Sequence, residues 1–232
     1  MQRRSLMLSA SALLAAPVIA RAQDFPVRPI RVVVPYAPGG QSDTVMRLLI
    51  PRMSEFLGQN IIVENRSGGG GTIGAGIVAN APADGYTLFF ESFAFAVAPL
   101  IHRGLPFDYE TAFVPIGQAV ALPYVLVTKR DYPARNVAEF IAAVKAKPGF
   151  TYGTPGIGTI GHLAGALLEL RAGIKMEHVA YRGGAESARD VAAGNIDGAI
   201  GTANSFAPII QNDRARGIAL TSGERRGSLA HL

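Results

Sequence analysis

The stretch that decides the fold is IRVVVPYAPGGQSD, residues 30–43. A run of mainly β-branched residues ends in a Pro- and Gly-rich turn, which predicts a buried strand that leads through a tight loop into a helix. Gly39 and Gly40 let the backbone approach a bound group, and Ser42 or Asp43 can cap the helix, whose first N–H groups point back at the loop. This geometry favours an anion such as a carboxylate. The alternative interpretation is an ordinary strand-to-helix turn of an α/β domain.

The N-terminus has the composition of an export signal. Arg3 and Arg4 give it a basic start, residues 6–20 are apolar and small, and Ala20-Arg21-Ala22 offers a cleavage site. The apolar run is shorter than the roughly 20 residues that a membrane-spanning helix needs. We therefore expect residues 1–22 to be a signal peptide and the mature protein to be soluble and periplasmic. The general secretory route is favoured, and the paired arginines also permit the twin-arginine route.

Charge and residue types exclude several classes of partner. The formal net charge of +5 falls to +2 without the signal peptide, because three arginines and no acidic residue are removed. No block of basic residues is present, so nucleic acid is not an expected partner. The chain has no cysteine, which excludes disulfides and thiolate metal sites. We expect no metal and no cofactor, and a core stabilised by packing alone.

A repeated unit organises the rest of the chain: an apolar strand, then Gly or Pro, then apolar residues at helical spacing. Repeated units of this kind imply an α/β fold with parallel sheets. Nine short strands fit two small sheets better than one sheet. The strands are expected near residues 31–34, 61–64, 87–90, 114–120, 124–128, 150–153, 177–181, 196–200 and 217–221.

Helix signals are uneven along the chain. Asn136 and Glu139 form a capping box, and Pro148-Gly149 provides the stop, around a helix whose apolar face is Val137, Phe140, Ile141 and Val144. Pro51 falls inside the first helix, where an interior proline costs about 3 kcal/mol or forces a kink. We expect a kink over residues 47–51 and an apolar face made of Val45, Leu48, Leu49, Phe56 and Leu57. Residues 93–113 have no clear period and are predicted to cross between the sheets.

A glycine tract, RSGGGGTIGAG, occupies residues 66–76. Its glycines at 69–74 formally satisfy the dinucleotide-binding pattern, but a tract this dense produces the pattern by chance, and Glu91 is the only acid near the ribose-binding distance. The better interpretation is a second loop whose glycines let the backbone come close to a bound ligand. The tetrapeptide Gly-Thr-Ile-Gly of this tract recurs at residues 158–161, between a predicted strand and a predicted helix. Two such loops facing each other across a cleft would hold a small anion from both sides.

Six ordered segments together resemble the tripartite tricarboxylate transporter receptor family, the Bug or TctC-type periplasmic solute-binding proteins. The resemblance covers essentially the whole mature chain. The segments are Arg28-Pro29-Ile30 through Gly39-Gly40-x-x-Asp43; Gly58-Gln59 through Val63-Glu64-Asn65-Arg66 and Gly74-Ala75; Pro82-x-Asp84-Gly85-Tyr86-Thr87-Leu88; Tyr152-Gly153-Thr154-x-Gly156-x-Gly158-Thr159; His162-Leu163-Ala164-Gly165; and His178-Val179-x-Tyr181-Arg182-Gly183.

This resemblance implies a type II periplasmic-binding-protein-like fold with two α/β lobes and mainly parallel sheets. Residues 23–122 would form the first part of lobe 1, residues 123–222 lobe 2, and residues 223–232 the start of a return to lobe 1. Family members continue beyond this point, so we expect the chain to be truncated and lobe 1 to be incomplete at the C-terminus, with apolar surface left uncovered. The implied function is capture of a small carboxylate, without catalysis, for the membrane subunits of a tripartite transporter.

The resemblance also implies where the ligand binds. The first loop would hold a carboxylate through backbone amides, and the second lobe would close over it. Ser92 and residues 181–184 follow strands, at the edge where open α/β sheets bind ligands. The predicted ligand-binding residues are Tyr36, Pro38, Gly39, Gly40, Asp43, Ser92, Thr154, Gly156, Gly158, Thr159, His162 and Tyr181.

Some of these assignments have structural alternatives. Asp43 is equally suited to capping the first helix, and His162 to packing or capping. The family's Met-Phe pair after residues 196–197 is replaced here by Ala199-Ile200, which puts a ligand contact from that loop in question.

Two other functions compete with transport. A secreted enzyme would need a nucleophile and a base, yet the chain has no Gly-x-Ser-x-Gly elbow and no His-Glu-x-x-His, and its histidines at 102, 162, 178 and 231 are scattered. No catalytic residue is therefore predicted. A ligand-sensing protein for a membrane sensor would use the same lobes. The ligand stays open among tricarboxylates, C4 dicarboxylates, acidic amino acids and aromatic acids, because backbone amides recognise any carboxylate.

Overall fold

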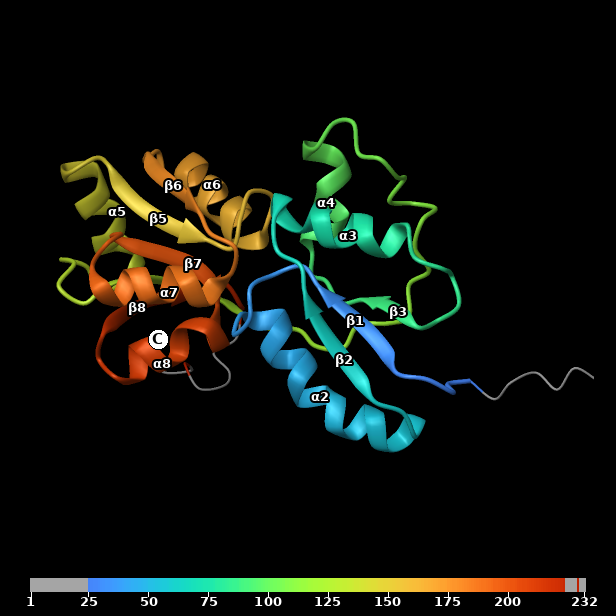
Figure 1. Cartoon of the computed structure of the whole chain (residues 1–232). Helices are drawn as coiled ribbons and strands as arrows, with labels where there is room; N and C mark the ends of the chain where they lie inside the picture. The colour runs from blue at the N-terminus through green and yellow to red at the C-terminus, as the bar shows by residue number, and fades with distance from the viewer. Residues whose placement is uncertain (1–24, 224–228, 230–232) are drawn as a thin grey trace, which may run out of the picture.

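The computed structural model describes residues 25–223 and residue 229, so the predicted signal peptide and most of residues 223–232 lie outside the described residues. The described chain forms two α/β lobes side by side, each with its own sheet and helices (Figure 1). Strands β1 and β5 both point toward the junction between the lobes. The loops that follow them therefore lie in the middle of the molecule. No helix of this part of the chain combines the length and apolarity needed to cross a membrane.

The first lobe has a parallel sheet in the order β2-β1-β3. Ile30, Val32 and Val34 of β1 pack with Met46 of helix α2, whereas the equally buried Val33 alternates to the opposite face. The elements are β1 (Ile30–Val34), α2 (Gln41–Leu57), β2 (Ile61–Asn65), the short 3-10 helix η2 (Gly69–Gly71), α3 (Thr72–Ala79), β3 (Thr87–Phe89) and α4 (Ala94–Ile101).

Helix α2 runs as one helix with Pro51 inside it, and the kink expected there stays a prediction. Its predicted apolar face is wrong in part, because the side chains of Leu48 and Phe56 are 74% and 89% exposed. The predicted set spans too wide an arc for one face. The residues that meet the sheet follow the helical period more closely and are Met46, Leu49, Ile50, Met53 and Leu57.

Residues 93–113 do not cross between the sheets, which corrects the sequence-based prediction. They contain α4 and four rings that pack on the other face of the first sheet, and the rings of Phe95 and Phe113 meet edge to face with centroids 5.0 Å apart. The apolar residues here face one another in a local cluster and not along a single helix, which hides their period. The cluster is built on Phe89, Phe95, Phe107, Tyr109 and Phe113.

The strand predicted over residues 114–120 is also absent from the described chain. This segment has no regular structure and leads from the aromatic cluster to the second sheet, with Val114 and Ile116 88% and 84% exposed. Alternating apolar residues favour a strand only where a neighbouring strand and a covering layer are available. Among the described residues, no strand pairs with this segment.

The second lobe has a mixed sheet in the order β6-β5-β7-β4-β8. Strand β5 is parallel to β6 and β7, and β4 is antiparallel to β7 and β8. The elements are β4 (Tyr124–Lys129), α5 (Val137–Ala146), β5 (Phe150–Thr154), α6 (Ile160–Ala172), β6 (Met176–Ala180), α7 (Gly184–Ala193), β7 (Gly198–Thr202), α8 (Ala203–Gln211) and β8 (Ala215–Leu220).

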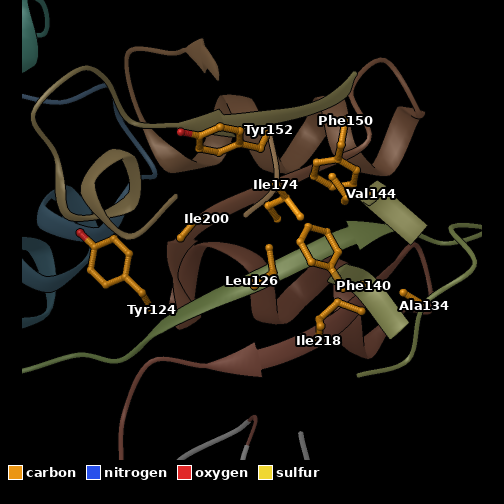
Figure 2. Close-up of a cluster of buried hydrophobic side chains, with 10 residues drawn as sticks. All are labelled: Tyr124, Leu126, Ala134, Phe140, Val144, Phe150, Tyr152, Ile174, Ile200 and Ile218. Atoms are coloured by element: carbon orange, nitrogen blue, oxygen red, sulfur yellow. The ribbon is translucent and has the colours of Figure 1, made fainter. Parts of the chain in front are cut away.

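Helices cover both faces of this second sheet. On one face Phe140 and Val144 of α5 pack with Phe150 and Leu126, as Figure 2 shows. On the other face α7 and α8 pack with β4 and β7 around the fully buried Phe206. The predicted N-cap is confirmed: Asn136 Oδ1 accepts a hydrogen bond from the Glu139 N–H at 2.9 Å. The return bond of the capping box falls one residue earlier, because Glu139 Oε2 accepts from the Arg135 N–H at 2.8 Å.

Replacing Asn136 by Ala should lower the free energy of unfolding by about 1 kcal/mol, because the first turn of α5 loses its cap. Asn136→Asp keeps an oxygen that accepts from Glu139 N–H and is the control, with little expected change. Urea denaturation of the three proteins measures the difference. Equal losses in the Ala and Asp variants would contradict the capping role.

Candidate functional site: a cleft between the lobes

The two lobes meet at the loops that leave their strands. The Ala37 N–H, in the loop after β1, donates to the Arg182 carbonyl at 3.0 Å. A Cβ placed on Gly70 of the first lobe would lie 2.4 Å from the Ile157 carbonyl oxygen of the second. The glycine-rich loops predicted to face each other across a cleft do so in this structure, and glycine is required at the contact because the backbones nearly touch.

Four helices begin around one small cavity between the lobes. Gly40 and Thr159 immediately precede α2 and α6, and Gly183 and Thr202 immediately precede α7 and α8. Within the described residues, no side chain caps any of these four helices. The cavity, about 20 Å³, is lined by Tyr36, Gly40, Gln41, Ser42, Ser92, Tyr124, Pro155, Thr159, Gly184, Thr202 and Ser205.

The electrostatics of this cavity come from the backbone. None of the described residues that line it carries a formal charge. Each helix start contributes roughly half a positive charge and several N–H groups without intrahelical partners. The convergence of four such ends makes the cavity attractive to an anion, although its present volume is about that of one water molecule.

A second, larger cavity of about 230 Å³ adjoins the same loops. Tyr36 and Pro155 line both cavities. Arg182 and His102 supply the basic side chains of the second one. Its lining is Pro35, Tyr36, Gly68, Gly69, Gly70, Gly71, His102, Pro155, Gly156, Ile157, Ala180, Tyr181 and Arg182.

The residues predicted from the sequence divide into two groups. Tyr36, Gly40, Ser92 and Thr159 line the first cavity, and Tyr36, Gly156 and Tyr181 line the second. The remaining predicted residues line neither cavity, although they lie in or beside the loops between β1 and α2 and between β5 and α6. They are Pro38, Gly39, Asp43, Thr154, Gly158 and His162. Contact of any of them with a ligand stays a prediction.

Asp43 shapes the first loop. Its Oδ2 accepts from the Gly39 N–H at 2.9 Å, and both its carboxylate oxygens accept from Arg47 Nε at 3.0 Å. Burial alone would raise the pKa of Asp43, but these hydrogen bonds outweigh it and hold the pKa below the ordinary value. Asp43 is therefore a charged residue that fixes the loop from behind.

Two histidines support the loop of the second lobe. His162 Nδ1 accepts from the Gly158 N–H at 3.2 Å, and His178 Nε2 lies 2.6 Å from Thr154 Oγ1. The two imidazole centroids are 4.4 Å apart. Burial, helped by His162, lowers the pKa of His178 to about 4. Both rings thus help to hold the loop that carries Gly156, His162 by a bond to the backbone and His178 through Thr154.

Glu91 is a functional candidate that sequence reasoning left aside. Its Oε1 accepts from the Tyr36 hydroxyl at 2.8 Å, from the Ser92 N–H at 2.6 Å and from the Ser92 hydroxyl at 2.9 Å. Its Oε2 is buried and has no hydrogen-bond partner among the described residues. Burial raises the pKa of Glu91 to about 7, against the effect of hydrogen bonds from Ser92 and Tyr36.

Sequence reasoning also missed residues that reach the cavity from the second lobe. Thr202 and Ser205 line it from the start of α8, in the loop where the Ala199-Ile200 substitution had put contacts in question. The usable signal was the strand followed by small polar residues and a helix. Tyr124 gave no such signal, because it stands at the beginning of β4 and reaches the cleft only through the fold.

Two α/β lobes with helix starts converging on the cleft define a type II periplasmic-binding-protein-like fold. A model described as the tripartite tricarboxylate transporter family receptor matches residues 45–232. The chain belongs to this family.

Similar proteins agree with this assignment. The "UPF0065 protein in tcbD-tcbE intergenic region" of Pseudomonas sp. (strain P51) is 38% identical over 91% of this chain and 63% of its own length. The structure of R. palustris Rpa4515 with adipate is 33% identical, with a TM-score of 0.86 over 90% of this chain and 71% of that one. MatC (Rpa3494) from Rhodopseudomonas palustris with bound malate is 28% identical, with a TM-score of 0.78 over 87% and 69%. The chain spans 58% to 66% of the length of three curated relatives.

Gly70→Ala should hold the lobes apart, because its Cβ would collide with the Ile157 carbonyl. Gly104→Ala is a matched control: Gly104 has a similar positive φ of 70° but open space around it. Each variant should lose about 1–2 kcal/mol of stability, because a residue with a Cβ is strained at positive φ. Gly70→Ala should lose more because of the collision, and only Gly70→Ala should increase the radius of gyration in small-angle X-ray scattering. An unchanged radius for Gly70→Ala would contradict this closed contact.

Glu91→Gln should change how stability depends on pH. Because the folded pKa of about 7 lies above the ordinary value of 4.5, the folded state holds this proton more tightly, and its contribution to stability is lost as pH rises from about 4.5 through 7. The loss is about 3 kcal/mol. Urea denaturation at pH 4.5 and pH 8 gives the change in unfolding free energy between the two pH values. This change should be about 3 kcal/mol more unfavourable in the wild type than in Glu91→Gln. Parallel profiles would show that Glu91 ionises normally.

Proposed function

We propose that this protein is a periplasmic solute-binding protein that captures a small carboxylate between its lobes, without catalysis, for the membrane subunits of a tripartite tricarboxylate-type transporter. The observation that carries the proposal is the convergence of four helix starts on a cavity lined without formal charge. Anions bind at helix N-termini because the N–H groups and the helix dipole both favour negative charge.

The shape of the cleft supports a small ligand. The two adjoining cavities share Tyr36, and the larger one adds Arg182 and His102, which suits a molecule with a second polar or acidic end. Two similar proteins are described with adipate and with malate, both dicarboxylates. A C4 to C6 dicarboxylate is thus a fitting ligand class for this cleft.

The side chains near the cleft support binding more than catalysis. The nearest hydroxyl–imidazole pair, Thr154 with His178, is fully buried at Thr154 and committed to the loop of Gly156. Among the described residues, no group of three or more His, Cys, Asp and Glu side chains is placed to hold a metal ion. Periplasmic location is supported by the family and by the basic, apolar N-terminus.

The proposal predicts stabilisation by carboxylates. Thermal unfolding with a panel that includes adipate, malate, citrate and glutamate should show one class raising the midpoint by about 5–10 °C at 100 times its dissociation constant, equivalent to about 2.7 kcal/mol. Glucose and neutral amides at the same concentrations are the controls. No shift with any carboxylate would overturn the proposal.

Ser205→Asp should weaken ligand binding without destabilising the fold. Ser205 lines the first cavity in the first turn of α8, where a carboxylate favours the helix dipole but repels an anionic ligand. We expect at least tenfold weaker carboxylate binding with unchanged or slightly higher thermal stability. Ser205→Asn has the same size without the charge and should bind far better than the Asp variant. Equal binding by the two variants, measured by titration calorimetry, would argue against an anion site here.

A further inference from the structure

Glu91 places an acid just behind the wall of a cleft that is otherwise built for anions. It lies two residues after the end of β3, and its carboxyl group sits behind two residues that line the first cavity, Tyr36 and Ser92. Its other side meets Gly71, which lines the second cavity: a Cβ on Gly71 would lie 2.9 Å from Glu91 Oε2. Glu91 itself lines neither cavity. A ligand would therefore sense Glu91 through its charge and through Tyr36 and Ser92.

The hydrogen bonds around Glu91 depend on its proton. When the carboxyl is ionised, the hydroxyls of Tyr36 and Ser92 both donate to Oε1, as their distances of 2.8 Å and 2.9 Å indicate. These two protons are then engaged with Oε1, so the two hydroxyls can offer only oxygen lone pairs to an anion in the cavity. When the carboxyl is protonated it is a weaker acceptor, and either hydroxyl is free to turn and donate to an anion.

Nothing on the neighbouring elements neutralises an ionised Glu91. The titratable groups that act on it are Tyr36 in the loop after β1, Tyr109 in the aromatic cluster and Tyr124 at the start of β4. His102 lies farther along the same wall, beside Gly70. Among the described residues, no Lys or Arg forms an ion pair with Glu91. The buried Oε2 without a partner makes the charged form costly.

We propose that Glu91 is a positioning residue that couples carboxylate capture to the uptake of one proton, a statement that rests on the proposed function. The proton passes from solvent to the Glu91 carboxylate as the ligand binds, and no bond of the ligand is made or broken. Protonation removes a negative charge next to the anion and releases the hydroxyls of Tyr36 and Ser92 to donate to it. The raised pKa of Glu91 places this exchange in the neutral range.

Titration calorimetry tests the coupling directly. The probe is whichever of adipate and malate stabilises the protein, since both stay largely ionised from pH 6.5 to pH 8. Each titration is run in phosphate and in Tris, whose different ionisation enthalpies report the protons exchanged. We expect the dissociation constant of the wild type to rise about tenfold between pH 6.5 and pH 8, with close to one proton taken up at pH 8.

Glu91→Gln is the matched variant, because the amide keeps the shape and stays neutral. It should bind the probe with little dependence on pH and without this proton uptake, so that at pH 8 it binds more tightly than the wild type. Any pH dependence that both proteins share comes from groups other than Glu91. Binding by the wild type without proton uptake, or the same uptake in Glu91→Gln, would overturn the coupling and leave the proposed function standing. If no carboxylate of the thermal-unfolding panel binds either protein at any pH, both proposals are overturned.

Tyr36→Phe provides a second test that leaves Glu91 in place and removes one of the hydrogen bonds to its Oε1. It removes the hydroxyl that would donate to the ligand only when Glu91 is protonated. The variant should therefore bind several-fold more weakly than the wild type at pH 6.5, with a smaller difference at pH 8. A constant ratio of the two dissociation constants across this range would contradict the role assigned to the Tyr36 hydroxyl.

Discussion

The constraint on which this structure depends is that the N–H groups at a helix start need acceptors. A buried donor left without one costs about 1–3 kcal/mol, and here α2, α6, α7 and α8 all begin around one cavity without a side-chain cap among the described residues. Thr159 and Thr202 stand at two of these ends and are good capping residues. Their hydroxyls instead pair with the Gly156 carbonyl oxygen and with Ser205 Oγ, and not with the helix N–H groups. Leaving them open keeps donors and positive potential available in the one place that both lobes share.

Glycine makes this convergence possible. Gly70 lies against the Ile157 carbonyl, Gly156 lies near the backbone of Gly70, and Gly183 packs on Ala37. A side chain at Gly70 would collide with the Ile157 carbonyl oxygen, whereas a Cβ at Gly183 would be tight and one at Gly156 would reach ordinary contact distance. Close approach of two backbones thus explains Gly70 of the glycine tract, whereas Gly69 and Gly71 meet side chains of their own lobe. Neither kind of contact requires a dinucleotide or a phosphate.

The local parts of the structure could be predicted from the sequence, and the parts that depend on distant partners could not. The strand and loop of residues 30–43 and the Asn136 cap are decided by neighbours in the chain, and both were anticipated. Residues 114–120 have strand-like alternation but meet no strand in the described chain. Ser205 and Tyr124 enter the cleft because the second sheet delivers them there. The Tyr124 segment carries no signal of that position, whereas for Ser205 the signal is a strand followed by small polar residues and a helix.

Asp43 and Glu91 show why residue type alone does not define an electrostatic site. Both acids lie just behind the same cleft. Asp43 accepts hydrogen bonds from Arg47 and from the Gly39 N–H, so its pKa is lowered and its charge is neutralised locally. Glu91 has hydroxyls and one backbone N–H around Oε1 and no described partner at Oε2, so burial dominates and its pKa is raised. One acid is thus a permanent part of the loop, while the charge of the other depends on pH and on what occupies the cleft.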